Sequence, residues 1–329
     1  MKVLVTGSAG HLGEALVRTL RANGQDVIGL DLKASEYTDC VGSIGDRDFV
    51  RESIAQADAV VHTATLHKPH VATHSRQDFI DTNISGTLNL LEEALAGGCS
   101  AFVYTSTTST FGDAMKPAEG DPAVWVDETL RPRPKNIYGV TKLAAEDFCQ
   151  LFHRNVGLPC LVLKTSRFFA EADDSEDLRG AFDDANLKVN ELLFRRVDIE
   201  DVVSAHLLAL EKAQSIGFDR FIISSTSPFR RRDAAQLGVD TPSVLARYLP
   251  DYIDAYALKG WRMFPTIGRV YDNAHARQTL GWMPRHSFEN AIRCVSAGED
   301  YRSELAQKIG VKGYHAGAFA DGLYPVDGF

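Results

Sequence analysis

The sequence lacks the features that mark a secreted, membrane-spanning or disulfide-bonded protein. No apolar run approaches the roughly 20 residues that a helix needs to cross a bilayer. The first residues lead directly into an apolar strand, without a small-residue cleavage site. The cysteines number five, an odd count, and form neither a CxxC pair nor a disulfide ladder. We therefore expect a reducing compartment, the cytoplasm, and no membrane partner.

An excess of positive charge is also absent. The chain has 35 Lys and Arg against 44 Asp and Glu, which gives a formal net charge of −9 at pH 7. Proteins that bind nucleic acids or membrane surfaces need a basic face, so we expect neither partner. The sequence contains no Gly-x-Ser-x-Gly elbow and no Walker loop, so acyl transfer and phosphoryl transfer have no support. A small-molecule partner remains.

What is present is an alternation of short apolar strands with amphipathic helices. Five runs have the composition of strands that are buried on both faces of a parallel sheet. They are Lys2–Thr6, Asp26–Leu30, Ala59–Thr63, Ala101–Thr105 and Cys160–Lys164. Between them apolar side chains recur at helical spacing, as at Leu12, Leu16 and Leu20. The alternation predicts an α/β protein with a Rossmann-type, doubly wound parallel sheet.

A glycine-rich turn follows the first strand and opens the first helix. Gly7 permits a tight turn, Gly10 lets backbone amides approach a pyrophosphate, and Gly13 lets the helix pack closely on the sheet. Asp31 ends the second strand, where a carboxylate accepts hydrogen bonds from an adenosine ribose and repels a 2′-phosphate. This predicts NAD rather than NADP, although Lys33 would weaken the preference. The alternatives are a turn without a ligand and an aspartate that only caps its strand.

The pattern loosens after about residue 165. The sequence predicts an acidic surface loop at Glu171–Asp184, a helix at Ile199–Leu210, a strand at Phe221–Ser224, and two or three more helices up to about residue 309. We expect residues 1–165 to form an NAD-binding Rossmann domain. Residues 166–329 are expected to form mostly a smaller C-terminal substrate-binding lobe, with some segments returning to the Rossmann core.

A tyrosine and a lysine four residues apart, Tyr138 and Lys142, begin a later helical segment and share one of its faces. A nearby ammonium and an oxidised nicotinamide favour the phenolate, which can take the proton of a substrate hydroxyl. By itself this spacing also fits an ordinary surface pair. Ser106 and Thr107 favour the catalytic interpretation, because they follow a strand at the sheet edge where ligands of this fold bind.

In combination these motifs resemble the extended short-chain dehydrogenase/reductase family, the NAD-dependent epimerase/dehydratase group. The resemblance runs from residue 1 to about residue 295. It rests on Thr6–Gly13, Asp31, Val60–Ala64, Thr82–Thr87, Phe102–Gly112, Tyr138–Lys142, Val197–Val203, Asp272-Asn273 and Leu280–Trp282. It implies a catalytic set of Thr107, Tyr138 and Lys142, with Ser106 supporting Thr107. It also implies that Lys142 grips the nicotinamide ribose and that Asn83 is structural, bonding backbone near the site.

The remaining site residues follow from the same resemblance. His11 and Leu12 would contact pyrophosphate, and Ala64 would pass close to the cofactor. The full expected NAD site is Gly7, Gly10, His11, Leu12, Gly13, Asp31, Leu32, Ser43, Ile44, Thr63, Ala64, Thr65, Asn83, Thr105, Tyr138 and Lys142. The expected substrate contacts are Thr107, Thr108, Arg167, Arg195 and Arg196.

Three departures from the family pattern narrow the function. Ser43-Ile44 stands where an adenine-binding aspartate is frequent, so adenine is not expected to be bound by an aspartate here. Thr108-Ser109 replaces the acid pair of dehydratases, so dehydration is not expected. Arg167–Ala170 replaces the usual Asn-x-Tyr-Gly-Pro run, which weakens the case for a nucleotide sugar. The arginines of this region either clamp an anionic substrate group or form salt bridges with the neighbouring acidic stretch.

The histidines do not indicate a metal. His62, His67, His70 and His74 match no zinc spacing and no cysteine joins them, so we interpret them as loop residues over the cofactor and expect no metal. His206 is expected to be packed or partly exposed rather than catalytic.

Three functions are compatible with this sequence. The first is a sugar or nucleotide-sugar epimerase with tightly held NAD. The second is a net NAD-dependent dehydrogenase or reductase of a sugar, sugar acid or other small alcohol. The third is a non-catalytic NAD-binding protein, which would not need Thr107, Tyr138 and Lys142 together. The resemblance implies a homodimer that pairs helices near residues 84–97 and 138–155. The tail Val311–Phe329 is rich in Gly, Ala and aromatics, and its composition leaves two alternatives: it wraps the body or it wraps a partner subunit.

Overall fold

The computed structural model describes residues 1–315 of the chain. Its centre is a seven-stranded sheet in the order β3-β2-β1-β4-β5-β7-β8, and every neighbouring pair of strands is parallel. The strands are β1 (Lys2–Thr6), β2 (Asp26–Asp31), β3 (Cys40–Val41), β4 (Ala59–His62), β5 (Ala101–Thr107), β7 (Cys160–Thr165) and β8 (Phe218–Ile223). The strand order reverses beside β1, as a doubly wound Rossmann-type sheet requires.

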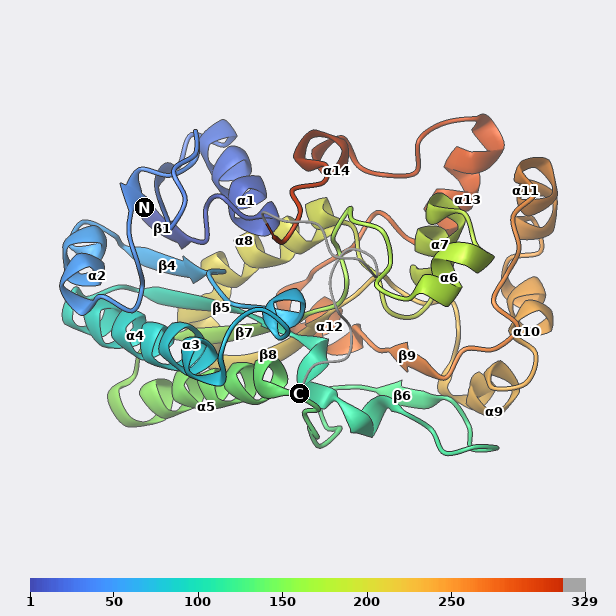
Figure 1. Ribbon diagram of the computed structural model, residues 1–329, viewed down its shortest axis with the longest axis horizontal. Helices are drawn as coiled ribbons and strands as arrows, with labels where there is room; N and C mark the ends of the chain where they lie inside the picture. The colour runs from blue at the N-terminus through green and yellow to red at the C-terminus, as the bar shows by residue number, and fades with distance from the viewer. Residues whose placement is uncertain (316–329) are drawn as a thin grey trace.

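Helices cover both faces of this sheet, which explains why its strands are apolar on both sides (Figure 1). Along β5 the side chains alternate: Val103 packs in the core beneath α1 and α8, whereas Phe102 and Tyr104 pack in the core beneath α2, α4 and α5. The helices of these layers are α1 (His11–Ala22), α2 (Arg47–Ile54), α4 (Gly86–Ala96), α5 (Ile137–Val156), α8 (Ile199–Ile216), α12 (Ala274–Leu280) and α14 (Glu304–Ile309).

A second apolar cluster lies beyond the carboxyl ends of the strands, at the right of Figure 1. It includes buried side chains of α7, α10, α11 and α13, such as Leu187, Leu245, Tyr256 and Phe288. Its elements are β6 (Val124–Val126), which pairs in parallel with β9 (Arg269–Tyr271), together with α6 (Glu176–Ala181), α7 (Asp184–Glu191), α9 (Ala234–Leu237), α10 (Thr241–Tyr248), α11 (Tyr252–Lys259) and α13 (Phe288–Ala297). Any group at the strand ends therefore faces this cluster.

The predicted fold class and the five principal strands are confirmed within one or two residues at each end, and β8 begins earlier than predicted. Two predictions were wrong. Six helices rather than two or three lie between residues 234 and 309. The acidic stretch Glu171–Asp184 is not a loop throughout, because α6 forms within it, and Glu171 and Asp173 are buried although most of its other acids lie at the surface. Of the predicted wrapping tail, residues 311–315 lie against the body, and residues 316–329 are outside the described part of the chain.

Within residues 1–315, the helices are too short or too polar to pass through a bilayer.

Candidate active site

The glycine turn is built for close approach of backbone to backbone. Gly7 has a φ of +74°, and a Cβ there would lie 2.7 Å from Thr63 Oγ1 and 2.8 Å from the Ala64 nitrogen. A Cβ on Gly13 would lie 1.9 Å from the Gly7 carbonyl oxygen. Larger residues would therefore push the turn away from β4 or lift α1 from the sheet. The cradle at the amino terminus of α1 fits a dinucleotide pyrophosphate, and this fit is the structural support for the cofactor.

Asp31 lies at the carboxyl end of β2, next to the glycine turn. Its Oδ2 accepts a hydrogen bond from the Ala9 nitrogen at 3.0 Å, and its Oδ1 accepts one from the Lys33 nitrogen at 2.9 Å. The carboxylate is thus fixed beside the turn. Of the other expected adenosine contacts, Leu32 and Ser43 are exposed, whereas Ile44 is buried in the core. The side chain of Ile44 therefore packs rather than lines a site.

The segment after β4 is held by Asn83, which lies in a π-helix at Ile80–Ser85. Asn83 Oδ1 accepts from the Leu66 nitrogen at 2.9 Å and from Thr65 Oγ1 at 2.9 Å. Its Nδ2 donates to the Leu66 carbonyl at 2.9 Å and to Thr141 Oγ1 at 3.0 Å. The backbone-bonding role expected for Asn83 is what the structure shows. Thr63, Ala64 and Thr65 are thereby fixed next to the glycine turn and the amino-terminal part of α5. Leu12, by contrast, is buried in the core.

Tyr138 and Lys142 lie in the first turns of α5, which Asn136 caps by accepting a hydrogen bond from the Gly139 nitrogen at 3.1 Å. The Tyr138 phenol lies close enough to the Thr107 side chain, at the end of β5, for that hydroxyl to lower its pKa. The Lys142 ammonium donates to the Thr105 carbonyl at 2.6 Å and lies 4.1 Å from the centre of the Tyr104 ring. The structure therefore brings all three expected catalytic side chains to one sheet edge, although Thr107 and Tyr138 are 31 residues apart in the sequence.

Burial dominates the electrostatics of this group. Tyr138 is 8% exposed, and its burial raises the pKa of the phenol to about 12, although the hydrogen bond with Thr107 opposes the rise. Burial lowers the pKa of Lys142 to about 7, and the Glu146 carboxylate opposes that change. Lys142 is therefore a group whose charge responds to its neighbours near neutral pH. A positive charge brought close to Tyr138 is needed before the phenolate forms at such a pH.

Two neighbouring hydroxyls do not join the set. Ser106 Oγ donates to Glu146 Oε1 at 2.5 Å and so points beneath the site, and the supporting role expected for it stays a prediction. Thr108 is buried, and its hydroxyl donates to the Thr165 carbonyl at 3.4 Å. Successive side chains of a strand point to opposite faces, and this alternation separates Ser106 from Thr107.

The three arginines expected at the substrate are ion-paired with carboxylates. Arg195 Nη2 lies 2.6 Å from Glu191 Oε1, Arg196 Nε lies 2.7 Å from Glu191 Oε2, and Arg167 Nη1 lies 3.3 Å from Glu191 Oε1. Arg167 also pairs with Asp173 and Asp174. Of the two alternatives weighed from the sequence, salt bridges are therefore the arrangement present, with the acidic stretch for Arg167 and Arg195 and with Glu191 of α7 for all three arginines. An anionic substrate group would have to compete with these carboxylates.

Sequence reasoning missed a second set of contacts around the glycine turn. His11 Nε2 lies 2.8 Å from Glu171 Oε1, and the same oxygen accepts from the Lys312 and Gly313 nitrogens at 3.0 Å. Lys312 Nζ donates to the Ala9 carbonyl at 3.0 Å and also pairs with Glu14. No sequence signal links positions so far apart. The segment Gly310–His315 is thus fastened over the start of α1.

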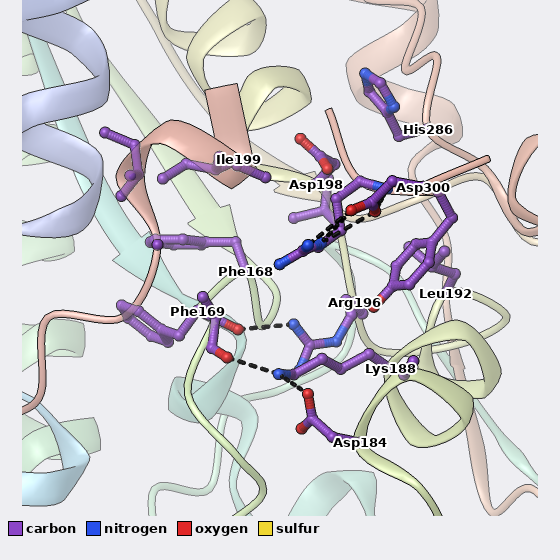
Figure 2. A pocket seen from close by; sticks show the side chains of 18 of the residues that line it. Phe168, Phe169, Asp184, Lys188, Leu192, Arg196, Asp198, Ile199, His286 and Asp300 are labelled. Atoms are coloured by element: carbon purple, nitrogen blue, oxygen red, sulfur yellow. Dashed lines mark hydrogen bonds and ion pairs between the residues drawn. The ribbon is translucent and has the colours of Figure 1, made fainter. Parts of the chain in front are cut away.

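A cavity of about 750 Å³ adjoins this region, on the side of His11, and contains none of Thr107, Tyr138 and Lys142 in its lining. Figure 2 shows that Arg196 and Lys188 point toward the segment after β7, where they donate to the carbonyls of Phe169 and Ala170 at 2.9 and 2.6 Å. These contacts fix the loop that separates the sheet edge from the second apolar cluster.

The histidines do not form a metal centre: among residues 1–315, no three His, Cys, Asp or Glu side chains are grouped as metal ligands. His62 is not a loop residue but a buried member of β4, bonded to Thr6 and Thr87. His67 stacks on Phe169 with ring centroids 5.5 Å apart, and His70 Nδ1 accepts from the His67 nitrogen at 3.0 Å.

The buried His206 predicts a pH dependence of stability. Its Nε2 lies 2.8 Å from Thr105 Oγ1 and its Nδ1 lies 2.8 Å from the Val202 carbonyl, as expected for a packed residue. Burial lowers its pKa from 6.5 to about 4. The unfolded chain therefore binds the proton more readily, and the stabilisation is full above about pH 6.5 and is lost as the pH falls toward 4. We expect a loss of about 3 kcal/mol across this range. Urea unfolding of the protein and of His206→Gln at several pH values measures it, and an unchanged slope in the variant contradicts this origin.

Comparison with known proteins agrees with this geometry. Residues 3–223 match the NAD dependent epimerase/dehydratase family. The chain belongs to this family. The UDP-glucose 4-epimerase of Rhizobium meliloti is 27% identical over 318 residues, which cover 86% of this chain and 92% of that protein. A protein of Haloferax volcanii, the low-salt glycan biosynthesis protein Agl12, is 31% identical over 193 residues, but these cover only 54% of this chain and 60% of that protein.

Solved structures agree on the fold. A short-chain dehydrogenase/reductase superfamily protein from Agrobacterium tumefaciens with bound NAD superposes with a TM-score of 0.65 at 22% identity, covering 94% of this chain and 99% of that one. The family match and the similarity to UDP-glucose 4-epimerases identify the chain as an enzyme, an oxidoreductase or isomerase of the NAD dependent epimerase/dehydratase family.

Proposed function

We propose that this enzyme epimerises a sugar or a nucleotide sugar and keeps its NAD bound between turnovers. The observation that carries the proposal is the meeting of Thr107 and Tyr138 at the sheet edge, with Lys142 one helical turn from Tyr138 and bonded to the Thr105 carbonyl. The similarity to the Rhizobium meliloti UDP-glucose 4-epimerase along most of both chains supports a sugar as substrate.

In this mechanism the nicotinamide supplies the acceptor and donor of hydride, and the chain supplies positioning and proton transfer. Thr107 holds the reacting oxygen of the sugar beside Tyr138. The Tyr138 phenolate takes the hydroxyl proton as the sugar carbon is oxidised, and the phenol returns that proton when the carbon is reduced from its other face. Lys142, in its charged form, stabilises the phenolate and binds the ribose.

The cofactor contacts are part of the proposal. The glycine turn of Gly7, Gly10 and Gly13 would hold the pyrophosphate, and Asp31 would accept hydrogen bonds from the adenosine ribose, which favours NAD over NADP. The carboxylate already lies beside the turn, where it accepts from the Ala9 nitrogen.

We propose that the enzyme is a homodimer formed through α4 and α5. Leu95, Val140, Leu151 and Val156 are large apolar side chains on these two helices, and each is more than one third exposed. Burial of these apolar side chains against a second copy of the chain would stabilise a dimer. The five cysteines are all free, which supports a cytoplasmic location.

A second candidate is a net dehydrogenase of a free sugar or sugar acid. It is favoured by the ion pairs of Arg167, Arg195 and Arg196, because a nucleotide diphosphate would have to displace Glu191 and Asp173 from these guanidinium groups. A non-catalytic NAD-binding protein has no use for a buried lysine beside a buried tyrosine and is the weakest candidate.

Gel filtration, followed by measurement of released nicotinamide and of turnover, separates these candidates. We expect the purified protein to elute at twice the chain mass and to release NAD⁺ or NADH when denatured, and then to convert a nucleotide sugar or sugar without net change in NADH. Protein that elutes empty and produces NADH steadily from a sugar or sugar acid would instead establish the dehydrogenase. Tight NAD binding with no turnover of any hydroxyl substrate would support the binding protein.

A further inference from the structure

A buried ion pair lies one helical turn beyond Lys142. Glu146 on α5 is 0% exposed and Lys164 on β7 is 2% exposed. The Lys164 ammonium donates to Glu146 Oε1 at 2.6 Å and to Oε2 at 2.8 Å. Oε1 also accepts the Ser106 hydroxyl at 2.5 Å, and Arg220 Nε approaches Oε2 at 3.4 Å from the rim.

This ion pair is connected both to β5, which carries Thr107, and to α5, which carries Tyr138 and Lys142. Three consecutive residues of β5 are each bound by α5: Thr107 by Tyr138, Thr105 through its carbonyl by Lys142, and Ser106 by Glu146. The partners on α5 are spaced by four residues, so they form one stripe on the helix. Ser106 is covalently joined to Thr107, and Glu146 therefore fixes the strand end that presents the catalytic hydroxyl.

Packing alone does not explain two charges at this depth. An apolar pair of the same volume usually stabilises a fold as well as, or better than, a buried ion pair, because both charges must be desolvated. A charged pair here has an additional effect: it sets the electrostatic environment of Lys142, which is itself 2% exposed. Charges that act through protein interact more strongly than charges separated by water.

We propose that Glu146 is a positioning residue that holds the catalytic end of β5 through Ser106 and, one helical turn from Lys142, keeps that lysine charged against the opposing charge of Lys164. The inference rests on the proposed function, because it concerns the same catalytic set. Glu146 itself touches neither Tyr138 nor the reacting atoms.

The charges around Lys142 act in opposite directions. Glu146 on the same helix favours the ammonium, and Lys164 on β7 disfavours it, whereas burial raises the pKa of the Cys149 thiol and keeps it neutral. Tyr104 on β5 places its ring under the ammonium, and His62 on β4 is held neutral by burial and by Lys142. Since burial lowers the pKa of Lys142 to about 7, a small change among these groups decides whether it is charged at neutral pH.

The test measures the protonation of Lys142 directly and needs no substrate. We would label the lysine ε-carbons with ¹³C in the full-length protein, assign the Lys142 signal with Lys142→Met, and titrate it by NMR. In Glu146→Gln the Lys142 midpoint is expected to fall by about one pH unit, a tenfold loss of proton affinity. In Lys164→Met it is expected to rise by about the same amount. In the double variant it should return close to that of the parent.

Shifts of opposite sign distinguish this role from a structural one, because loss of packing would not raise the midpoint in one variant and lower it in the other. Should Glu146→Gln fail to fold, Lys164→Met and the double variant still carry the test. A Lys142 midpoint that is unchanged in the folded variants, or that moves in the same direction in both single variants, would overturn the inference. If the enzyme acts on no sugar, these titrations keep their outcome, so the two proposals fail separately.

Discussion

Replacing Tyr138 with phenylalanine is expected to lower turnover by about 10²- to 10⁴-fold while NAD stays bound. The substitution removes only the phenol oxygen, which is the proposed proton carrier. The ring remains packed beside Thr107 and Lys142, so the fold and the cradle at Gly7 and Gly13 are untouched. The loss should appear in kcat, since the hydroxyl acts on the reacting oxygen and not on cofactor binding. Turnover and bound nicotinamide would be measured on the same preparation.

Tyr252→Phe is the matched control for this substitution. Tyr252 is also buried, but its hydroxyl donates only a long hydrogen bond of 3.4 Å to the Pro242 carbonyl, in the second apolar cluster. Its loss should leave kcat within about twofold of the parent, in line with a small effect on stability. Turnover of Tyr138→Phe close to the parent value would remove Tyr138 from the mechanism. A loss of bound NAD in that variant would show that the tyrosine acts mainly on the cofactor.

The second large effect is expected from Glu191→Gln, which should destabilise the fold by about 3–5 kcal/mol. Glu191 is 0% exposed and accepts hydrogen bonds from Arg196 and Arg167, and Arg195 pairs with it at 2.6 Å. An amide of the same shape leaves Arg196 without its carboxylate partner, and Arg167 and Arg195 then depend on Asp173 and Asp174. Because guanidinium groups cannot give up their protons, the uncompensated charge remains in the folded state.

The carboxylate also gives this cluster a defined acid sensitivity. The neighbouring arginines hold the pKa of Glu191 near about 2, below its ordinary value of 4.5. A lowered pKa contributes stability above about pH 4.5, and that contribution is lost as the pH falls toward 2. Urea unfolding at pH 7 and at pH 4 should therefore show a difference between parent and Glu191→Gln that shrinks at the lower pH.

Glu304→Gln provides the comparison on the surface. Glu304 pairs with Lys308 at 3.3 Å on α14, but its side chain is 88% exposed. Exposed pairs of this kind contribute about 0–1 kcal/mol because solvent screens them. If Glu191→Gln were no more destabilising than Glu304→Gln, the buried cluster would not contribute to stability in the way its geometry indicates.

Part of this structure could be predicted from the sequence because the relevant signals are local. The strands β1, β4 and β5 are buried on both faces and so contain the apolar runs Val3–Val5, Ala59–Val61 and Ala101–Tyr104. The glycine turn, and the spacing of Tyr138 and Lys142, are also local patterns. In contrast, β3, β6 and β9 have two or three residues each, too few to show a period.

The rest of the site depends on contacts between distant segments. Ser106 and Thr107 look equivalent in sequence, yet strand alternation aims Ser106 at Glu146. Charge patterning in Glu171–Asp184 suggested solvent exposure, whereas pairing with Arg167 and Arg195 allows the Asp173 carboxylate to be buried. Such pairing cannot be derived from one segment alone, because each partner has an ordinary surface composition.

The fastening of Lys312 to Ala9 has a consequence for how the enzyme is made. These residues are separated by 303 positions along the chain, and their contact closes over the start of α1. During synthesis β1 and the glycine turn emerge first, but Lys312 arrives only after nearly all of the described chain. The dinucleotide cradle can therefore form early while its outer wall is completed last.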